Sequence, residues 1–358
     1  MIYRETGQFK TSYAADRQLF PIRQDRLGMI LLLLIAFVGV PLLASPYWLA
    51  AILTPFLIFS LAAIGLNLLT GYAGQISLGS AAFMAVGAFA SYNFALRLPW
   101  IPTLVSFVLG GLCAALVGLL FGLPSARIRG FYLAVATLAA QFFITWCLVK
   151  FGWFSNYSSS GAIAAQSFSA FGWAVDSPAR HYLVTLSFVV VLSLLAKNLV
   201  RSDVGRAWMA VRDRDVAAEV MGISPFKTKL LAFAVSSFYC GVAGALAAYC
   251  YLGMVAPDYF TLDLSFRILF MIVIGGMGTI LGAFIGAAFI VLIPIVLNNL
   301  LPPLVAWAHI PLTTAVAANV ESMLFCALII FTLVVEPRGL ARLWQILKEK
   351  LRSWPLPH

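Results

Sequence analysis

The chain has 358 residues, of which 62% are hydrophobic and only 10% are charged. A soluble domain needs about 25% charged residues to cover its surface, so this composition excludes a soluble protein and requires lipid as the solvent. The net charge of +10 does not indicate a nucleic-acid-binding protein, because the basic residues cluster between apolar runs and at the chain ends.

The first 26 residues are polar, and we expect residues 1–26 to form a cytoplasmic tail. They lack an early apolar core followed by a small-residue cleavage site, which a removable signal peptide requires. We therefore expect the first membrane span to act as an uncleaved insertion signal.

Apolar segments fill the chain from residue 27 to residue 336, which we predict to be one transmembrane domain. A helix needs about 20 apolar residues to cross a bilayer. The candidate segments are 27–44, 48–69, 76–96, 101–122, 131–149, 182–200, 230–252, 266–277, 280–300 and 319–336. The sequence thus predicts an all-α polytopic membrane protein with about ten segments, within a range of about 8 to 11. The short eighth segment ends in Gly275-Gly276-Met277-Gly278, where we expect the helix to break within the bilayer.

The distribution of basic residues supports this arrangement. If all ten segments cross or return, four basic pieces of the chain lie on one side, namely the two tails (1–26 and 337–358) and the loops 123–130 and 197–229. Four of the 23 basic residues then remain on the other side: Arg97, Lys150, Arg180 and Arg267. Positive charge accumulates on the cytoplasmic side, so we expect both termini in the cytoplasm and the loop 150–181 outside.

Two glycine-rich segments, 66–79 and 275–286, combine small residues with polar side chains. Glycines at four-residue spacing allow helices to pack backbone to backbone. The alternative is that broken backbone and polar side chains line a wet translocation path. The candidate path residues are Asn67, Gln75, Ser77, Gly79, Gln141, Gly276 and Thr279, and Asn298 and Asn299 fit either interpretation.

No motif in the chain indicates an enzyme. A phosphate-binding loop, a nucleophile elbow and a His/Cys/carboxylate cluster at metal spacing are all absent, so we predict no catalytic residue and no metal site. Charged groups are scarce at depth, where we single out Glu321, about one turn from the outer end of the last span. This scarcity indicates that the driving energy enters from outside, through a cytoplasmic loop.

The loop 201–229 is the most heavily charged interruption of the apolar chain. On one continuous helix, an apolar stripe would comprise Ala207, Ala210, Val211, Ala217, Ala218 and Met221, with Arg214 projecting from it. Trp208, Arg212, Asp215 and Glu219 would line an adjacent face, where Arg212 and Asp215 can pair. We expect Gly222 to end the helix in the left-handed conformation. The pattern favours a docking surface for a soluble partner, and the alternative is a helix lying on the lipid surface.

Five runs, taken together and in order, resemble the branched-chain amino acid permease family of bacterial ABC importers, the LivM type. They are GLNLLTGYAGQISLGSAAFMAVGAFASY (65–92), RIRGFYLAVATLA (127–139), GRAWMAVRDRDVAAEVMGISPFKTKLLAFAVSSFYCGVAGAL (205–246), LDLSFRILFMIVIGGMGTILGAFIGA (262–287) and EPRGLARL (336–343). The resemblance implies that the DxAAxxxG portion contacts an ATPase. The expected coupling residues are Arg206, Arg212, Arg214, Asp215, Ala217, Ala218, Glu219 and Gly222.

The resemblance also implies the partners of a permease domain in the bacterial inner membrane. They are a second, LivH-like permease subunit, two ABC ATPase subunits, a periplasmic substrate-binding protein and membrane lipid. ATP and magnesium would bind to the partner subunits, with no cofactor on this chain, and nucleic acid is not an expected partner.

The solute stays open at this point, because related permeases move urea, short amides or aromatic acids as well as branched-chain amino acids. The chain also departs from the family's TGGxxGI-like turn, since residues 155–163 read SNYSSSGAI. The alternatives from other classes are an ion-coupled secondary carrier or channel that needs no ATPase, and a membrane anchor without transport.

Overall fold

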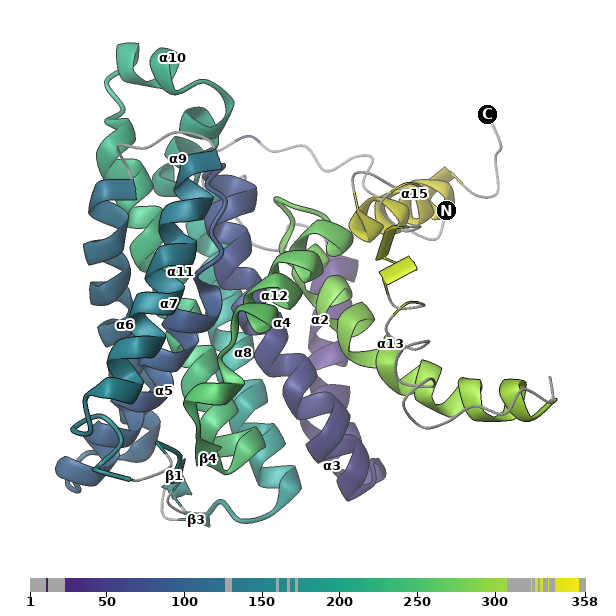
Figure 1. The fold of residues 1–358 in the computed structure, drawn as a ribbon. Coiled ribbons are helices and arrows are strands. Elements are labelled where there is room, and N and C mark those ends of the chain that lie inside the picture. Colours follow the sequence, from purple (N-terminus) through teal and green to yellow (C-terminus); the bar gives the residue numbers. More distant parts are fainter. Residues whose placement is uncertain are drawn as a thin grey trace.

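The structure is a computed structural model, and it describes residues 11, 23–125, 131–158, 161–165, 168–170, 173–307, 323, 326–327, 329–330, 334 and 339–353. Helices make up almost all of this part of the chain, and most of them run side by side in one bundle (Figure 1). The expectation of an all-α polytopic membrane protein is confirmed.

The first half of the chain supplies α4, one of the two central helices, together with α5, α6 and α7, which pack against one another. Its elements are α2 (Arg23–Leu34), η1 (Ile35–Gly39), α3 (Val40–Leu43), η2 (Trp48–Leu53), α4 (Thr54–Asn67), η3 (Leu68–Tyr72), α5 (Ser80–Arg97), α6 (Thr103–Ser125) and α7 (Phe131–Lys150). The segments η1, η2 and η3 are π-helical insertions that continue the helices beside them.

The second half begins with a loop that carries short strands. Its elements are β1 (Ile163–Ala164), β2 (Ser169–Ala170), β3 (Trp173–Ala174), α8 (Pro178–Arg201), α9 (Asp203–Asp213), α10 (Asp215–Val220), α11 (Pro225–Leu246), the π-helical η4 (Ala247–Leu252), β4 (Met254–Val255), the 3-10 turn η5 (Pro257–Tyr259), α12 (Leu262–Gly275), α13 (Ile280–Trp307) and α15 (Leu340–Ser353). Antiparallel pairs join β1 to β4 and β2 to β3. These strands lie at the end of the bundle opposite α10 (Figure 1).

The core forms where small residues let helices approach closely. Among the residues described, six helices are long and apolar enough to cross a membrane. In the most apolar windows of the spans Trp48–Tyr72 and Pro225–Leu252, 72% of residues are buried, whereas none is buried in Arg26–Leu43. The helices α4 and α11 therefore form the centre, and α2 lies at the lipid-facing edge. The backbone of Gly87 on α5 lies directly against Gly241 on α11, which leaves no room for a side chain there.

Each of the first nine predicted segments coincides with a helix, although several boundaries differ. The expected break after the eighth segment is confirmed: α12 ends at Gly275, and Gly276 and Gly278 adopt positive φ angles of 115° and 77°. The prediction for 76–96 was wrong at its start, because α5 begins only at Ser80 and no helix covers 73–79. The tenth segment, 319–336, and Glu321 lie largely or wholly outside the described residues. The number of crossings and the side of each terminus stay predictions.

Candidate coupling surface and translocation path

The helix α9 is firmly seated on the ends of α8 and α11. The side chain of Trp208 is completely buried, and its indole N–H donates to the carbonyl of Thr228, 3.1 Å away. A side chain at Gly205 would collide with the backbone of Val200 at the end of α8. These contacts hold α9 directly against two of the long helices of the bundle.

Arg212 joins the end of α9 to a second part of the bundle. Its Nη1 donates to the carbonyl of Gly71 over 2.8 Å, and its Nε donates to Asp213 over 2.9 Å. The stem of Arg212 packs on Gly74, where an added Cβ would lie 2.7 Å from Cγ of the arginine. The predicted pairing of Arg212 with Asp215 was wrong, because the guanidinium turns toward η3 and Asp213.

The predicted single helix across the loop was also wrong, because the chain breaks at Arg214. This residue is extended, with φ −155° and ψ 99°, and it ends α9 while its carbonyl accepts the first hydrogen bond of α10, from Ala218 N–H. The break rotates α10 relative to α9, so the six predicted stripe residues do not share one face. Val211 and Ala218 are buried, whereas Ala217 and Met221 are exposed.

The surface of α10 carries apolar side chains that point away from the bundle. Val216, Val220 and Met221 are 62%, 84% and 70% exposed. Arg214 and Glu219 are exposed beside them. Figure 1 shows α10 at the tip of the molecule, beyond the ends of the long helices. We call the exposed residues Arg214, Val216, Glu219, Val220 and Met221 the α10 tip.

The end of α10 confirms the expectation that Gly222 ends the helix in the left-handed conformation. Its φ of 86° is left-handed, its N–H donates to Glu219, and the N–H of Ile223 donates to Ala218 over 3.0 Å. This pattern is a Schellman motif, which fixes the direction in which the chain leaves a helix.

The remaining expected coupling residues are more dispersed. Arg206 pairs with Asp203 within the first turns of α9 and donates to the carbonyl of Arg201 over 3.2 Å. Asp215 accepts a hydrogen bond from the N–H of Val216 in the first turn of α10. Arg206 and Asp215 therefore shape the loop itself, at some distance along the chain from one another.

Two of the predicted path regions meet at the foot of the coupling loop. Asn67 is buried at the end of α4, where its Nδ2 donates to the carbonyl of Thr279 (2.7 Å) and its Oδ1 accepts the N–H of Gly278 (2.8 Å). The hydroxyl of Thr279 donates to the carbonyl of Gly276 over 2.9 Å. A side chain at Gly71 would collide with both Asn67 and Gly278. We call this contact between η3 and the α12–α13 turn the glycine junction.

The other predicted path residues lie around the non-helical segment 73–79. Gln141, halfway along α7, accepts the N–H of Ala82 over 2.7 Å and donates to the carbonyl of Phe260 over 2.9 Å. Ser77 accepts the N–H of Gly79 over 3.3 Å. Gln75 is buried, and its side-chain oxygen accepts no hydrogen bond from the residues the structure describes. Non-helical backbone thus lies against the middle of a membrane-length helix, where it needs such polar partners.

Close backbone packing explains the glycine-rich segment 275–286. A side chain at Gly286 would collide with the carbonyl of Met271, and one at Gly275 would collide with the carbonyl of Gly282. The structure thus bears out the packing interpretation for these positions of α12 and α13. Whether the polar residues of both regions also line a path for solute stays a prediction.

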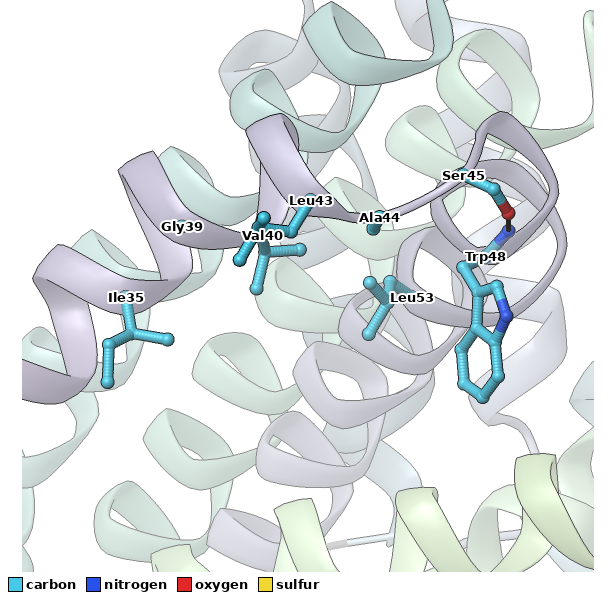
Figure 2. Close-up of a pocket in the computed structure, with 8 residues that line it drawn as sticks. All are labelled: Ile35, Gly39, Val40, Leu43, Ala44, Ser45, Trp48 and Leu53. Carbon is cyan, nitrogen blue, oxygen red and sulfur yellow. Dashed lines mark hydrogen bonds between the residues drawn. The ribbon is translucent and has the colours of Figure 1, made fainter.

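Two cavities lie apart from all the predicted path residues. One, of about 580 Å³, is lined mainly by apolar side chains of α5, α6 and α7, and Asn93 and Arg97 also contribute to its wall. The other, of about 630 Å³, lies between the N-terminal helices and is lined by Ile35, Gly39, Val40, Leu43, Ala44, Ser45, Trp48 and Leu53. Figure 2 shows that Ser45 and Trp48 at its edge are joined by a hydrogen bond, in which the backbone N–H of Trp48 donates to the hydroxyl oxygen of Ser45. Both linings are dominated by apolar groups, which suits acyl chains better than a charged solute.

Sequence reasoning missed several residues that hold these sites together. Thr137 accepts the N–H of Leu78 over 2.9 Å, and Ser265 accepts the N–H of Ala81 over 3.0 Å. Thr137 stands four residues before Gln141, so helical spacing could have placed both on one face of α7. No spacing or motif in the sequence indicated that Ser265 would contact the start of α5.

Comparison with known proteins agrees with this architecture. A sequence profile of the family described as "Branched-chain amino acid transport system / permease component" matches residues 48–333, which is most of the chain. The chain belongs to this family.

Individual relatives carry the same description. The high-affinity branched-chain amino acid transport system permease protein LivM of Salmonella typhimurium is 33% identical over 265 residues, which cover 67% of this chain and 61% of that protein. LivM of Escherichia coli is 33% identical over 260 residues, covering 66% of this chain and 60% of the relative. A probable branched-chain amino acid transport permease protein LivM of Methanocaldococcus jannaschii is 23% identical over 241 residues, covering 66% and 67%.

The matched part of the chain thus spans about three-fifths of the length of the first two permease relatives. No solved structure matches the chain. The family membership and the multiple membrane-length helices together establish a multi-pass membrane protein of this permease family.

Proposed function

We propose that this chain is the membrane-spanning permease subunit of an ATP-driven importer for branched-chain or related hydrophobic amino acids. The single observation that carries the proposal is the exposed α10 tip, built on a helix that is bound rigidly to the spans of a branched-chain permease fold. A group of exposed apolar side chains bordered by charged residues is typical of a protein-docking surface.

The α10 tip is the docking point for an ATPase in this proposal. Val220 and Met221 supply apolar contact area, and Arg214 supplies a positive charge for a carboxylate of the partner. The buried Ala218 and the Schellman motif at Gly222 hold the short helix in a fixed direction. Glu219 contacts the ATPase within the α10 tip, and Arg206 contacts it from the first turns of α9.

Movement of the docked ATPase passes from α10 into the bundle by two routes. One is the seat of α9 on α8 and α11 through Trp208. The other is the hydrogen bond from Arg212 to Gly71, which leads to the glycine junction and the segment 73–79. Interfaces of this kind switch between discrete packings, so a small rotation of α9 changes which side of the bundle is open.

The proposed partners follow from the family. They are a second, LivH-like permease subunit, two ABC ATPase subunits that bind ATP and magnesium, and a periplasmic substrate-binding protein that sets most of the specificity. The assembly would lie in the bacterial inner membrane, with the α10 tip and both termini in the cytoplasm.

Docking can be tested with substitutions at the α10 tip. We expect Val220→Asp combined with Arg214→Glu to abolish co-purification of the ATPase with the affinity-tagged chain, because both the apolar contact and the charge are removed. Lys227→Glu is the matched control, since it reverses a charge at an exposed site of the same loop outside the tip. Undiminished recovery of the ATPase with the double variant would rule out this docking surface.

Transmission can be separated from docking at Arg212. We expect Arg212→Ala to retain the ATPase but to lose most of the ATP-driven uptake, at least about tenfold, because one charge-assisted hydrogen bond is worth about 1.5–3 kcal/mol. Asp213→Asn is the control, because an exposed ion pair contributes little. Equal uptake by the Arg212→Ala variant and the control would contradict this route.

Other solutes and another mechanism remain as alternatives to be tested. Urea, short amides or aromatic acids would be the solutes if the substrate-binding protein prefers them to leucine, isoleucine and valine in a direct binding measurement. An ion-coupled carrier would take up solute in liposomes that contain this chain alone and an ion gradient.

A further inference from the structure

The C-terminal helix α15 has an amphipathic pattern that the proposed coupling mechanism does not use. Its sequence, LARLWQILKEKLRS, repeats apolar residues at helical spacing, and Leu343, Trp344 and Leu347 fall on one face. In the structure these three side chains are 48%, 54% and 48% exposed. A large apolar face is therefore left uncovered by the described part of the chain.

The attachment of α15 places it at the same end of the bundle as α9. Gly339, with a φ of 83°, packs directly on the backbone of Gly275 and Gly276. A Cβ added to Gly339 would collide with Gly276 and would lie 2.9 Å from the carbonyl carbon of Gly275. The neighbouring Gly278 lies at the glycine junction, which Arg212 of α9 also contacts through Gly71. The start of α15 is thus fixed to the α12–α13 turn.

The direction of α15 suits a helix that lies in a membrane surface. Figure 1 shows α15 running across the direction of α6 and α11, beside the start of α13. A helix fixed at the ends of the spans and lying across them occupies the level of the lipid headgroups.

The basic residues of α15 indicate that its apolar face contacts an anionic lipid surface. Lys348 and Lys350 flank this face on its two sides, and Arg342 lies on the polar side. Lysines in these positions extend their ammonium groups toward headgroups while their stems lie on apolar surface. Trp344 is a residue type that favours the membrane–water interface. A protein groove would not need this border of positive charge, whereas an anionic lipid surface does.

We propose that α15 is an interfacial anchor that inserts Leu343, Trp344 and Leu347 into the leaflet at the α10 end of the bundle and binds anionic phospholipid headgroups through Lys348 and Lys350. The anchor would hold the α12–α13 turn at a fixed depth, through the contact of Gly339 with Gly276. The proposal does not depend on the identity of the transported solute or on the presence of an ATPase.

The test uses the full-length chain in nanodiscs of phosphatidylcholine mixed with phosphatidylglycerol. A fluorescent probe is attached to Leu347→Cys, and in a second sample to Gln345→Cys on the polar face, after replacement of Cys113, Cys147 and Cys326 by serine. We expect nitroxide-labelled lipid to quench the probe at position 347 strongly and aqueous iodide to quench it weakly, with the reverse order at position 345. Equal access of iodide to both positions would overturn the proposal, as would protection of position 347 that arises only when a protein partner is added.

The charge requirement is tested with Lys348→Glu combined with Lys350→Glu. Each lysine near an anionic surface strengthens binding about fivefold, so we expect the lipid quenching at position 347 to fall sharply in this variant and also in nanodiscs of phosphatidylcholine alone. Gln345→Glu is the control, because it adds negative charge on the opposite face. The double variant Lys348→Gln with Lys350→Gln is measured as well. It removes both positive charges without adding negative ones, so it tests the charge requirement even if the double glutamate variant misfolds. Unchanged quenching in both lysine variants would overturn the role of anionic lipid.

Discussion

Asn67 is buried at the end of α4, where both ends of its side-chain amide bond to the α12–α13 turn. We expect Asn67→Ala to lower the free energy of unfolding by about 2 kcal/mol, because Gly278 N–H and Thr279 C=O lose their partner. The check is the midpoint of thermal unfolding in detergent. Asn198→Ala, at an exposed position of α8, serves as the control and should change little. A midpoint equal to that of the control would show that the amide does not hold this junction.

The sequence predicted the conformation of single residues correctly where that conformation depends only on neighbouring residues in the chain. Gly222 was expected to be left-handed at a helix end, and it is, because only a residue without Cβ adopts that conformation at low cost. The partner of Arg212 was not predictable, since the carbonyl of Gly71 is far away in the chain. Helical spacing offered Asp215 instead, and it took no account of the break at Arg214.

The packing of α12 on α13 depends on glycines that no side chain can replace without movement. We expect Gly286→Ala to destabilise the protein by about 1–3 kcal/mol, because the added methyl group collides with the backbone of Met271. Gly28→Ala is the matched substitution on α2, where no atom lies within 4 Å of the added Cβ. The two variants are compared by thermal unfolding in detergent, and equal midpoints would contradict the close packing of these two helices.

At the scale of elements, the length of each apolar run in the sequence was enough to predict the long helices. The glycine cluster at 275–278 was enough to predict the break after α12. The non-helical residues 76–79 were wrongly included in a span, because they directly precede the small and apolar residues that form α5. What ends the helix there is tertiary: Thr137 and Arg212 contact the segment 73–79 from other elements. The break at Arg214 had only a weak signal, the acidic Asp215 that opens α10.

At the scale of the whole molecule, the α10 tip and the loop with the short strands lie at opposite ends (Figure 1). We expect a membrane-impermeant maleimide to label Asn156→Cys in intact cells, and to label Val220→Cys only after permeabilisation, because positive charge places α10 in the cytoplasm. The exposed native cysteine Cys326 is replaced by serine in both variants. Labelling of both positions in intact cells would contradict the predicted orientation.

In the proposed importer, ATP hydrolysis on a partner subunit drives the conformational change of this chain that opens and closes the path for solute. The most direct test is uptake of radiolabelled leucine by proteoliposomes that contain the complete assembly, purified through a tag on this chain and supplied with its substrate-binding protein. We predict accumulation that requires ATP and that disappears when the phosphate-loop lysine of the ATPase is substituted. The same rate of uptake without ATP, or with the substituted ATPase, would contradict the account.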